Sequence, residues 1–245
     1  KWATIKHKKA ANDKARGKLF AKVLRQVEVA AREGGGDPDM NPTLRTMFQK
    51  ARDASIPIDT IDRAVKRGTG ELDGVTYEQI TYEGYAPGAV AVMVEVLTDN
   101  RNRTGAEIRN IFSRNGGSTS EPGAVAWQFD RKGQLIVPRS VDEEELMLTA
   151  LDAGAEDIVD DGDSWRVTTP PADLHAVRTA LEEAAIAVDS ADQTMVPQAT
   201  IALDTAESAK KVLRLIDALD DHDDVQAVHA NFDIPDTILE TVEAG

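Results

Sequence analysis

Residues 134–197 read QLIVPRSVDEEELMLTALDAGAEDIVDDGDSWRVTTPPADLHAVRTALEEAAIAVDSADQTMVP, and this stretch decides the fold. Its apolar pattern predicts six elements in the order strand, helix, strand, strand, helix, strand. Their ranges are 134–138, 140–153, 158–159, 165–168, 171–186 and 193–196. That order is typical of a ferredoxin-like domain. We therefore expect 134–197 to be a complete ferredoxin-like α+β domain.

Local signals support the first helix and the central turn of this stretch. Ser140 and Glu143 form a capping-box pair that opens the helix, and Gly154 ends it. The polar residues 160–163 predict a hairpin turn between the two central strands.

The segments on either side of this stretch share one sheet in our interpretation. The segment before it predicts strands at 77–85, 89–97 and 125–130, with a helix at 102–115. One helix is too few to cover such a sheet. The segment after it supplies a second helix, with Val212, Leu215, Ile216 and Leu219 inward, between strands near 200–203 and 225–232. We expect a domain made of 71–133 and 198–245, into which 134–197 is inserted.

The N-terminal region predicts three short helices, each with one apolar stripe. The first begins at Gly17, the second has Asn41 as its N-cap before Pro42, and the third begins at Pro57. Such stripes are satisfied only by packing together, so 17–70 should be a three-helix bundle. Residues 1–16 lack apolar periodicity and predict a mobile basic arm. The whole fold class is thus multi-domain α and α+β.

Charge is divided by position along the chain. Residues 1–70 hold 16 Lys and Arg against 8 Asp and Glu, whereas the remainder holds 12 against 35. The net charge of the whole chain is −15, but it is the sum of a basic N-terminal region and an acidic remainder. An acidic surface repels nucleic acid, so contact with a polyanion should be confined to the basic end.

The basic arm and the start of the first helix are the strongest candidate nucleic-acid contact. Their lysines and arginines would neutralise phosphates and displace counterions, while Trp2 could stack on an exposed base. The alternative is a solvated tail with Trp2 lying on the bundle. The candidate residues are Lys1, Trp2, Lys6, Lys8, Lys9, Lys14, Arg16, Lys18, Lys22 and Arg25.

The third helix adds Arg63, Lys66 and Arg67, which the helical repeat places opposite its apolar stripe. They could point outward together and contact a nucleic-acid backbone. The alternative is an ordinary solvated face, because Asp59 and Asp62 lie among them. No Asn or Gln on that face favours reading of bases.

A second candidate for anion or partner contact is the turn 98–104, which joins a strand to a helix N-terminus. Arg101 and Arg103 would suit a phosphate or an acidic partner. In the structural alternative, Asp99 or Asn102 caps the helix and the arginines pair with acids such as Glu83 or Glu95.

Signals of catalysis are weak, and we expect no enzyme, no cofactor and no metal. Cysteine is absent, which also suits a reducing cytoplasm. The four histidines are scattered, and His222-Asp223-Asp224 is best interpreted as a solvated turn. No phosphate-binding glycine loop or serine nucleophile motif is present. No apolar run approaches the roughly 20 residues that span a bilayer, so no membrane partner is expected.

Several motifs resemble those of the YebC/PmpR family. They are KWATIKHKK (1–9), RGK (16–18), GGGDP (34–38), YEGYAPG (82–88) and LTDNRNRT (97–104). The resemblance extends over essentially the whole chain. Ala89 is a departure, because the family usually has glycine or a polar residue there.

This resemblance implies three domains, with the third inserted in the second. It also implies a cytoplasmic DNA-binding transcriptional regulator. The family's mitochondrial relative is a translational activator, and bacterial members are connected with relieving ribosome stalling. The expected function is therefore a nucleic-acid-binding regulator, with a ribosome-associated translation factor that binds RNA as the alternative. Oligomeric state is left open.

Overall fold

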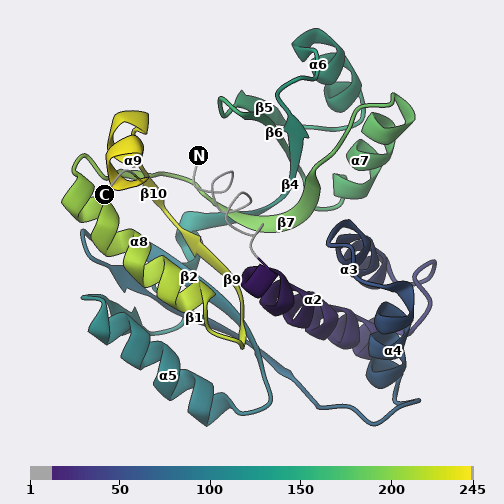
Figure 1. Ribbon diagram of the computed structural model, residues 1–245, viewed down its shortest axis with the longest axis horizontal. Coiled ribbons are helices and arrows are strands. Elements are labelled where there is room, and N and C mark those ends of the chain that lie inside the picture. Colours follow the sequence, from purple (N-terminus) through teal and green to yellow (C-terminus); the bar gives the residue numbers. More distant parts are fainter. Residues whose placement is uncertain (1–12, 244–245) are drawn as a thin grey trace. The chain divides into compact units, whose positions relative to one another are not determined.

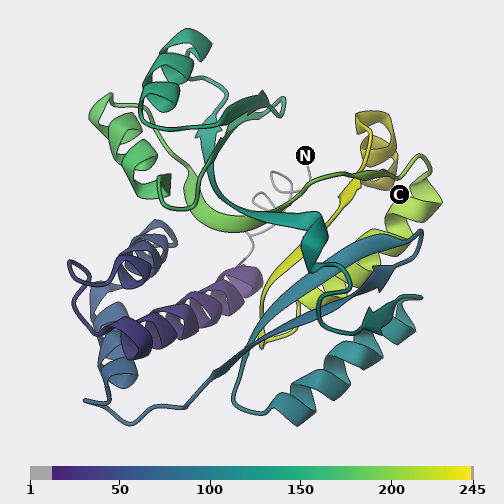
Figure 2. The ribbon, with the colours of Figure 1, turned by 180° about the vertical axis from the view of Figure 1, so that it is seen from behind.

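The computed structural model describes residues 13–243 and has a multi-domain α+β fold (Figures 1 and 2). The described residues divide into two compact units. Unit 1 contains residues 75–130 and 196–243, and unit 2 contains residues 13–74 and 131–195. Both units are therefore built from segments that are distant in sequence.

Unit 1 is built on a four-stranded sheet with the order β3-β1-β2-β9. Strand β2 is antiparallel to β1 in the register Glu78↔Thr98 through Ala86↔Val90, and antiparallel to β9 on its other edge. The C-terminal segment thus supplies a strand to the sheet that the earlier segment begins. The strands are β1 (Glu78–Ala86), β2 (Val90–Thr98), β3 (Ser118–Ser120) and β9 (Val225–Ala230).

Two helices, α5 (Arg101–Arg114) and α8 (Ala206–Asp220), lie side by side against this sheet (Figure 1). Alternate valines of β2 and the apolar stripes of both helices form one buried cluster, which includes Val92, Phe112 and Leu215. The short parallel pair β8 (Ile201–Ala202) and β10 (Phe232–Asp233) and the helix α9 (Asp236–Glu243) complete the unit. Helix α9 was not predicted from the sequence.

The turn between β1 and β2 holds Ala89 at φ 59°, in the left-handed region. A side chain with a Cβ adopts that conformation at a cost, and glycine adopts it freely. Ala89 therefore carries backbone strain at the position where the chain departs from the YebC/PmpR pattern.

The helical part of unit 2 consists of α2 (Asp13–Gly34), α3 (Pro42–Asp53) and α4 (Ile58–Thr69). Their apolar stripes share one buried cluster around Val27, Leu44 and Ile61. Helix α2 begins at Asp13, four residues before the start at Gly17 that the apolar pattern predicted. The pattern missed the first turn because that turn is polar and has no apolar stripe.

Asn41 connects the first two of these helices. Its Oδ1 accepts the backbone N–H of Leu44 at 3.0 Å and caps α3, as the sequence predicted. Its Nδ2 donates to the carbonyls of Ala30 at 2.8 Å and Gly35 at 2.9 Å. The buried Asn41 side chain thus binds backbone carbonyls at the end of α2 and a backbone N–H group at the start of α3.

The remainder of unit 2 has a four-stranded sheet with the order β5-β6-β4-β7 and two helices. Leu135, Leu146, Val167, Val177 and Leu181 belong to its buried core. The elements are β4 (Phe129–Pro138), α6 (Glu143–Asp152), β5 (Asp157–Asp160), β6 (Ser164–Thr169), α7 (Leu174–Glu183) and β7 (Ser190–Pro197).

Two expectations for this region were wrong. Asp142, not Ser140, caps α6, since its carboxylate accepts the N–H of Glu145 at 3.0 Å. The separate strands expected at 125–130 and 134–138 are a 3-10 turn, Ala126–Gln128, followed by one long strand. The N–H groups of Val125 and Ala126 are bound by a side chain and so do not join a sheet.

No helix between residues 13 and 243 is long and apolar enough to cross a lipid bilayer.

Candidate nucleic-acid interface

The basic arm lies mostly outside the described residues. Lys1, Trp2, Lys6, Lys8 and Lys9 fall there, so their predicted contacts stay predictions. The backbone of Lys14 and Arg16 belongs to the first turn of α2.

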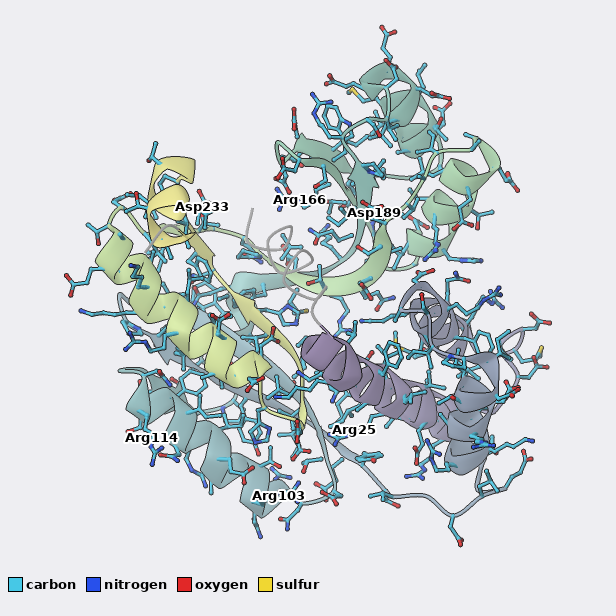
Figure 3. The ribbon with its side chains drawn as sticks, in the orientation of Figure 1. Arg25, Arg103, Arg114, Arg166, Asp189 and Asp233 are labelled. Carbon is cyan, nitrogen blue, oxygen red and sulfur yellow. The ribbon has the colours of Figure 1, made fainter. Side chains whose placement is uncertain are left out.

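Three further cations of the candidate set, Lys18, Lys22 and Arg25, follow one another along α2. Spacings of four and three residues place them on one face of the helix, opposite the buried Val23 and Val27. All three side chains are half-buried. Figure 3 shows Arg25 on α2. The helix thus continues the basic segment as one row.

The cations of α4 do not form one outward group. Arg63 and Lys66 are exposed, but Arg67 turns to α2, where its Nε donates to the buried Glu28 carboxylate at 3.1 Å. A buried carboxylate requires such a partner. The outward face that remains also carries the exposed Asp59 and Asp62, so its charge is balanced.

The turn before α5 is held by its own side chains. Asn100, rather than Asp99 or Asn102, caps the helix, and its Oδ1 accepts the N–H of Arg103 at 3.1 Å. The N–H of Asn100 donates to Thr98 Oγ1 at 2.9 Å. Side chains of the turn itself therefore accept the N–H groups of Asn100 and Arg103.

The buried carboxylate of Asp224 organises the same turn from the loop before β9. Its Oδ2 accepts from Thr104 Oγ1 at 2.7 Å, Arg103 Nη2 at 2.8 Å and Thr98 Oγ1 at 3.2 Å. Arg103 also donates to Asp99 at 3.0 Å. The hydrogen bond to Asp224 is the main cause that raises the pKa of Arg103. Glu83 and Glu95, the partners first considered, are not used by Arg103.

The two arginines of this turn therefore have different roles. Arg103 ties α5 to the Asp224 loop. Arg101 is exposed, and its backbone carbonyl accepts the hydroxyl of Tyr82 at 3.5 Å. Of the two arginines, Arg103 is paired with acids, whereas the Arg101 side chain has no acidic partner among residues 13–243.

We expect Thr104→Val to lower the free energy of unfolding of unit 1 by about 1–2 kcal/mol. Valine keeps the shape but removes the donor to Asp224, which leaves a buried carboxylate with fewer hydrogen bonds. Urea unfolding followed by circular dichroism measures the change. The exposed Ser113 on the same helix gives the control, since Ser113→Ala should leave stability unchanged. Equal stability of both variants would contradict the role given to Asp224.

Glu83 organises the loop that follows β3. Its buried carboxylate accepts the N–H groups of Gly123 and Val125 at 2.6 Å each and of Ala126 at 2.9 Å. Burial opposes ionisation of this carboxyl, but the three bonds outweigh it and lower its pKa. The loop carries Trp127, whose side chain is 69% exposed. The sequence pattern did not single out this exposed tryptophan, whose Nε1 donates to the carbonyl of Ala124 at 3.1 Å.

Both ring nitrogens of His222 are engaged by neighbouring groups. Its Nε2 lies 2.8 Å from Glu107 Oε2 of α5, and its Nδ1 accepts the N–H of Asp224 at 3.1 Å. Between residues 13 and 243, no three His, Asp or Glu side chains are placed to hold a metal ion.

Two more arginines of α5, Arg109 and Arg114, are exposed on the helix that Arg101 begins. Figure 3 shows Arg103 and Arg114 toward the two ends of α5. The helical period around Ile108 and Phe112 was sufficient to place both arginines outward. They were missed because the candidate set stopped at the turn.

Comparisons with known proteins agree over the whole chain. The model of the TACO1/YebC protein N-terminal domain matches residues 1–71, and that of the TACO1/YebC second and third domain matches 77–232. A probable transcriptional regulatory protein of Halothermothrix orenii is 57% identical over 245 residues, covering 99% of this chain and 97% of the relative. One of Rubrobacter xylanophilus is 58% identical over 244 residues, covering 99% and 97%.

A solved structure is also similar. The crystal structure of the conserved hypothetical protein Aq1575 from Aquifex aeolicus superposes with a TM-score of 0.84 at 45% sequence identity. The match covers 91% of this chain and 93% of that one. Family models, relatives and structure therefore agree, and this chain belongs to the TACO1/YebC family.

Proposed function

We propose that this protein is a nucleic-acid-binding regulator of gene expression, acting as a DNA-binding transcriptional regulator. The observation that carries the proposal is the division of charge, with 16 cations against 8 acids in residues 1–70 of an acidic chain. The name of the relatives, probable transcriptional regulatory protein, agrees with it. We propose that the protein acts in the cytoplasm and has no catalytic role.

The domain assignment of the sequence is part of the same proposal. We infer a helical bundle over 17–70, a domain of 71–133 with 198–245, and a ferredoxin-like domain over 134–197 inserted in it. The sheet order β5-β6-β4-β7 supports the ferredoxin-like assignment, and the pairing of β9 with β2 supports the insertion.

A second candidate is a ribosome-associated translation factor that binds RNA through the same basic segment. It is favoured by the mixed charge on the outward face of α4, where Asp59 and Asp62 accompany Arg63 and Lys66. Such a face does not suit reading of base edges, which leaves the phosphate contacts of the basic segment, and these contacts carry no sequence information. Backbone contact serves structured RNA as well as DNA.

Crosslinking and sequencing of the nucleic acid bound in cells, together with ribosome co-sedimentation, separates the two functions. Discrete promoter DNA without ribosome association supports the transcriptional regulator and contradicts the translation factor. Ribosomal RNA together with co-sedimentation does the reverse. Recovery of neither nucleic acid would contradict both.

We expect the replacement of Lys6, Lys8 and Lys9 by alanine to weaken nucleic-acid binding on the order of tenfold. Three fewer neutralised phosphates should reduce the slope of log affinity against log salt by about 2–3. Fluorescence anisotropy across a salt series measures both values.

The matched control removes three cations from α8, at Lys210, Lys211 and Arg214. Its salt slope should stay near that of the wild type. Equal slopes for the arm variant and the wild type would exclude the arm as a contact.

A further inference from the structure

Helix α5 concentrates positive charge within an acidic part of the chain. Residues 75–130 contain four Lys and Arg residues against seven Asp and Glu, and all four cations, Arg101, Arg103, Arg109 and Arg114, lie in α5. Arg103 is occupied by Asp224 and Asp99, while the other three side chains are exposed.

These three arginines have no acidic partner in the described part of the molecule. No ion pair or hydrogen bond joins the guanidinium group of Arg101, Arg109 or Arg114 to another residue between 13 and 243. The only acid of the helix, Glu107, is occupied by His222 at 2.8 Å. The outward face of α5 thus carries unpaired positive charge.

Four short side chains lie on the surface between Arg109 and Arg114, together with Arg103, which is paired with Asp99 and Asp224. At the α-helical repeat, Asn102, Ala106, Asn110 and Ser113 lie on the arc from Arg109 to Arg114, and all four are exposed. Long side chains would hold a ligand away from the helix backbone, whereas short ones allow close approach. Asparagine and serine also add hydrogen-bonding groups.

The neighbouring helix of the same layer shows the ordinary alternative. Along α8, the exposed Lys210, Lys211 and Arg214 alternate with the exposed Glu207 and Asp217, and Lys211 pairs with Glu207 at 2.7 Å. Its face is balanced and internally paired, as solvated helices usually are. Helix α5 therefore differs from α8 in that Arg109 and Arg114 on its exposed face have no acidic partner on the same helix.

We propose that the outward face of α5, with Arg109 and Arg114, is a second contact for the phosphate backbone of the nucleic acid. The proposal rests on the proposed nucleic-acid function and names a surface in unit 1 for it. Guanidinium groups bind phosphate oxygens in pairs of parallel hydrogen bonds. Arg109 and Arg114 lie about 7.5 Å apart along the helix axis, so they can contact neighbouring phosphates of one ligand.

The test compares two double variants with equal charge change. R109Q/R114Q removes two cations from α5, and K210Q/R214Q removes two from α8. Both are measured by fluorescence anisotropy across a salt series on a labelled DNA duplex and on an RNA duplex of the same sequence. The α5 variant should bind several-fold more weakly and lose about 1.8 from its salt slope, against little change for the α8 variant.

The measurements on DNA and on RNA show which phosphate backbone this face of α5 binds. A reduced slope of log affinity against log salt on either duplex supports the contact. Equal slopes for the two variants, with wild-type binding intact, overturn the α5 contact and leave the proposed function standing. Failure of the wild type to bind either duplex overturns both. Unchanged circular dichroism of R109Q/R114Q shows that a loss of affinity is not a loss of fold.

Discussion

Glu83→Gln is expected to lower the free energy of unfolding of unit 1 by about 3 kcal/mol. The substitution keeps the length of the side chain but replaces one carboxylate oxygen by an amide that donates. At least one of the N–H groups of Gly123, Val125 and Ala126 then loses its acceptor, and the bonds that remain lose their charge. Bonds to a charged group contribute about 1.5–3 kcal/mol each, and an unsatisfied buried donor costs a similar amount.

Hydrogen exchange of these three amides, measured alongside urea unfolding, locates the effect. Their exchange should accelerate in Glu83→Gln, whereas the exposed Glu121 of the same loop gives a neutral control as Glu121→Gln. Unchanged protection in Glu83→Gln would show that the carboxylate does not hold the loop.

The contribution of Glu83 also depends on pH with a definite sign. Its pKa in the folded protein is lowered from the ordinary 4.5, so the folded state favours the ionised form. The stabilisation is fully present above pH 4.5 and is lost as the pH falls through the lowered pKa. Wild type and Glu83→Gln should therefore converge in stability only under acidic conditions.

Gly68→Ala is expected to lower the free energy of unfolding of the helical part of unit 2 by about 2–3 kcal/mol. A Cβ at Gly68 would lie 2.3 Å from the carbonyl oxygen of Glu28 and 2.8 Å from Ala31 Cβ. Helices α2 and α4 would have to separate, and overpacking of this kind costs more than the better helix propensity of alanine returns.

Gly17 gives a matched control within α2. A Cβ there meets nothing within 4 Å, so Gly17→Ala should be neutral or slightly stabilising. Thermal unfolding by circular dichroism compares the two. A Gly68→Ala variant as stable as Gly17→Ala would contradict the close approach of α2 and α4.

Most helices and strands were predictable because their signals are local. Asn41 before Pro42 marked the start of α3, and the valines of β2 marked a buried strand. Errors arose where a long-range contact replaced a local rule. Val125 was expected in a strand, but a glutamate about 40 residues away binds its N–H group.

The candidate site was predictable in its location and less so in its members. Charge alone marked the basic segment and the turn at Arg101 and Arg103. It did not distinguish an arginine that faces solvent from one that serves the fold. Arg67 and Arg103 are both engaged by acids far away in sequence, Glu28 and Asp224.

The sequence by itself determined where the chain is basic, which residues form helices and which family motifs are present, because composition and periodicity depend only on neighbouring residues. The tertiary structure alone decided which charges remain unpaired, since pairing depends on which acids the fold brings close. In the folded chain Arg109 and Arg114 of α5 are exposed without an acidic partner among residues 13–243, whereas Arg67 and Arg103 form ion pairs with Glu28 and Asp224.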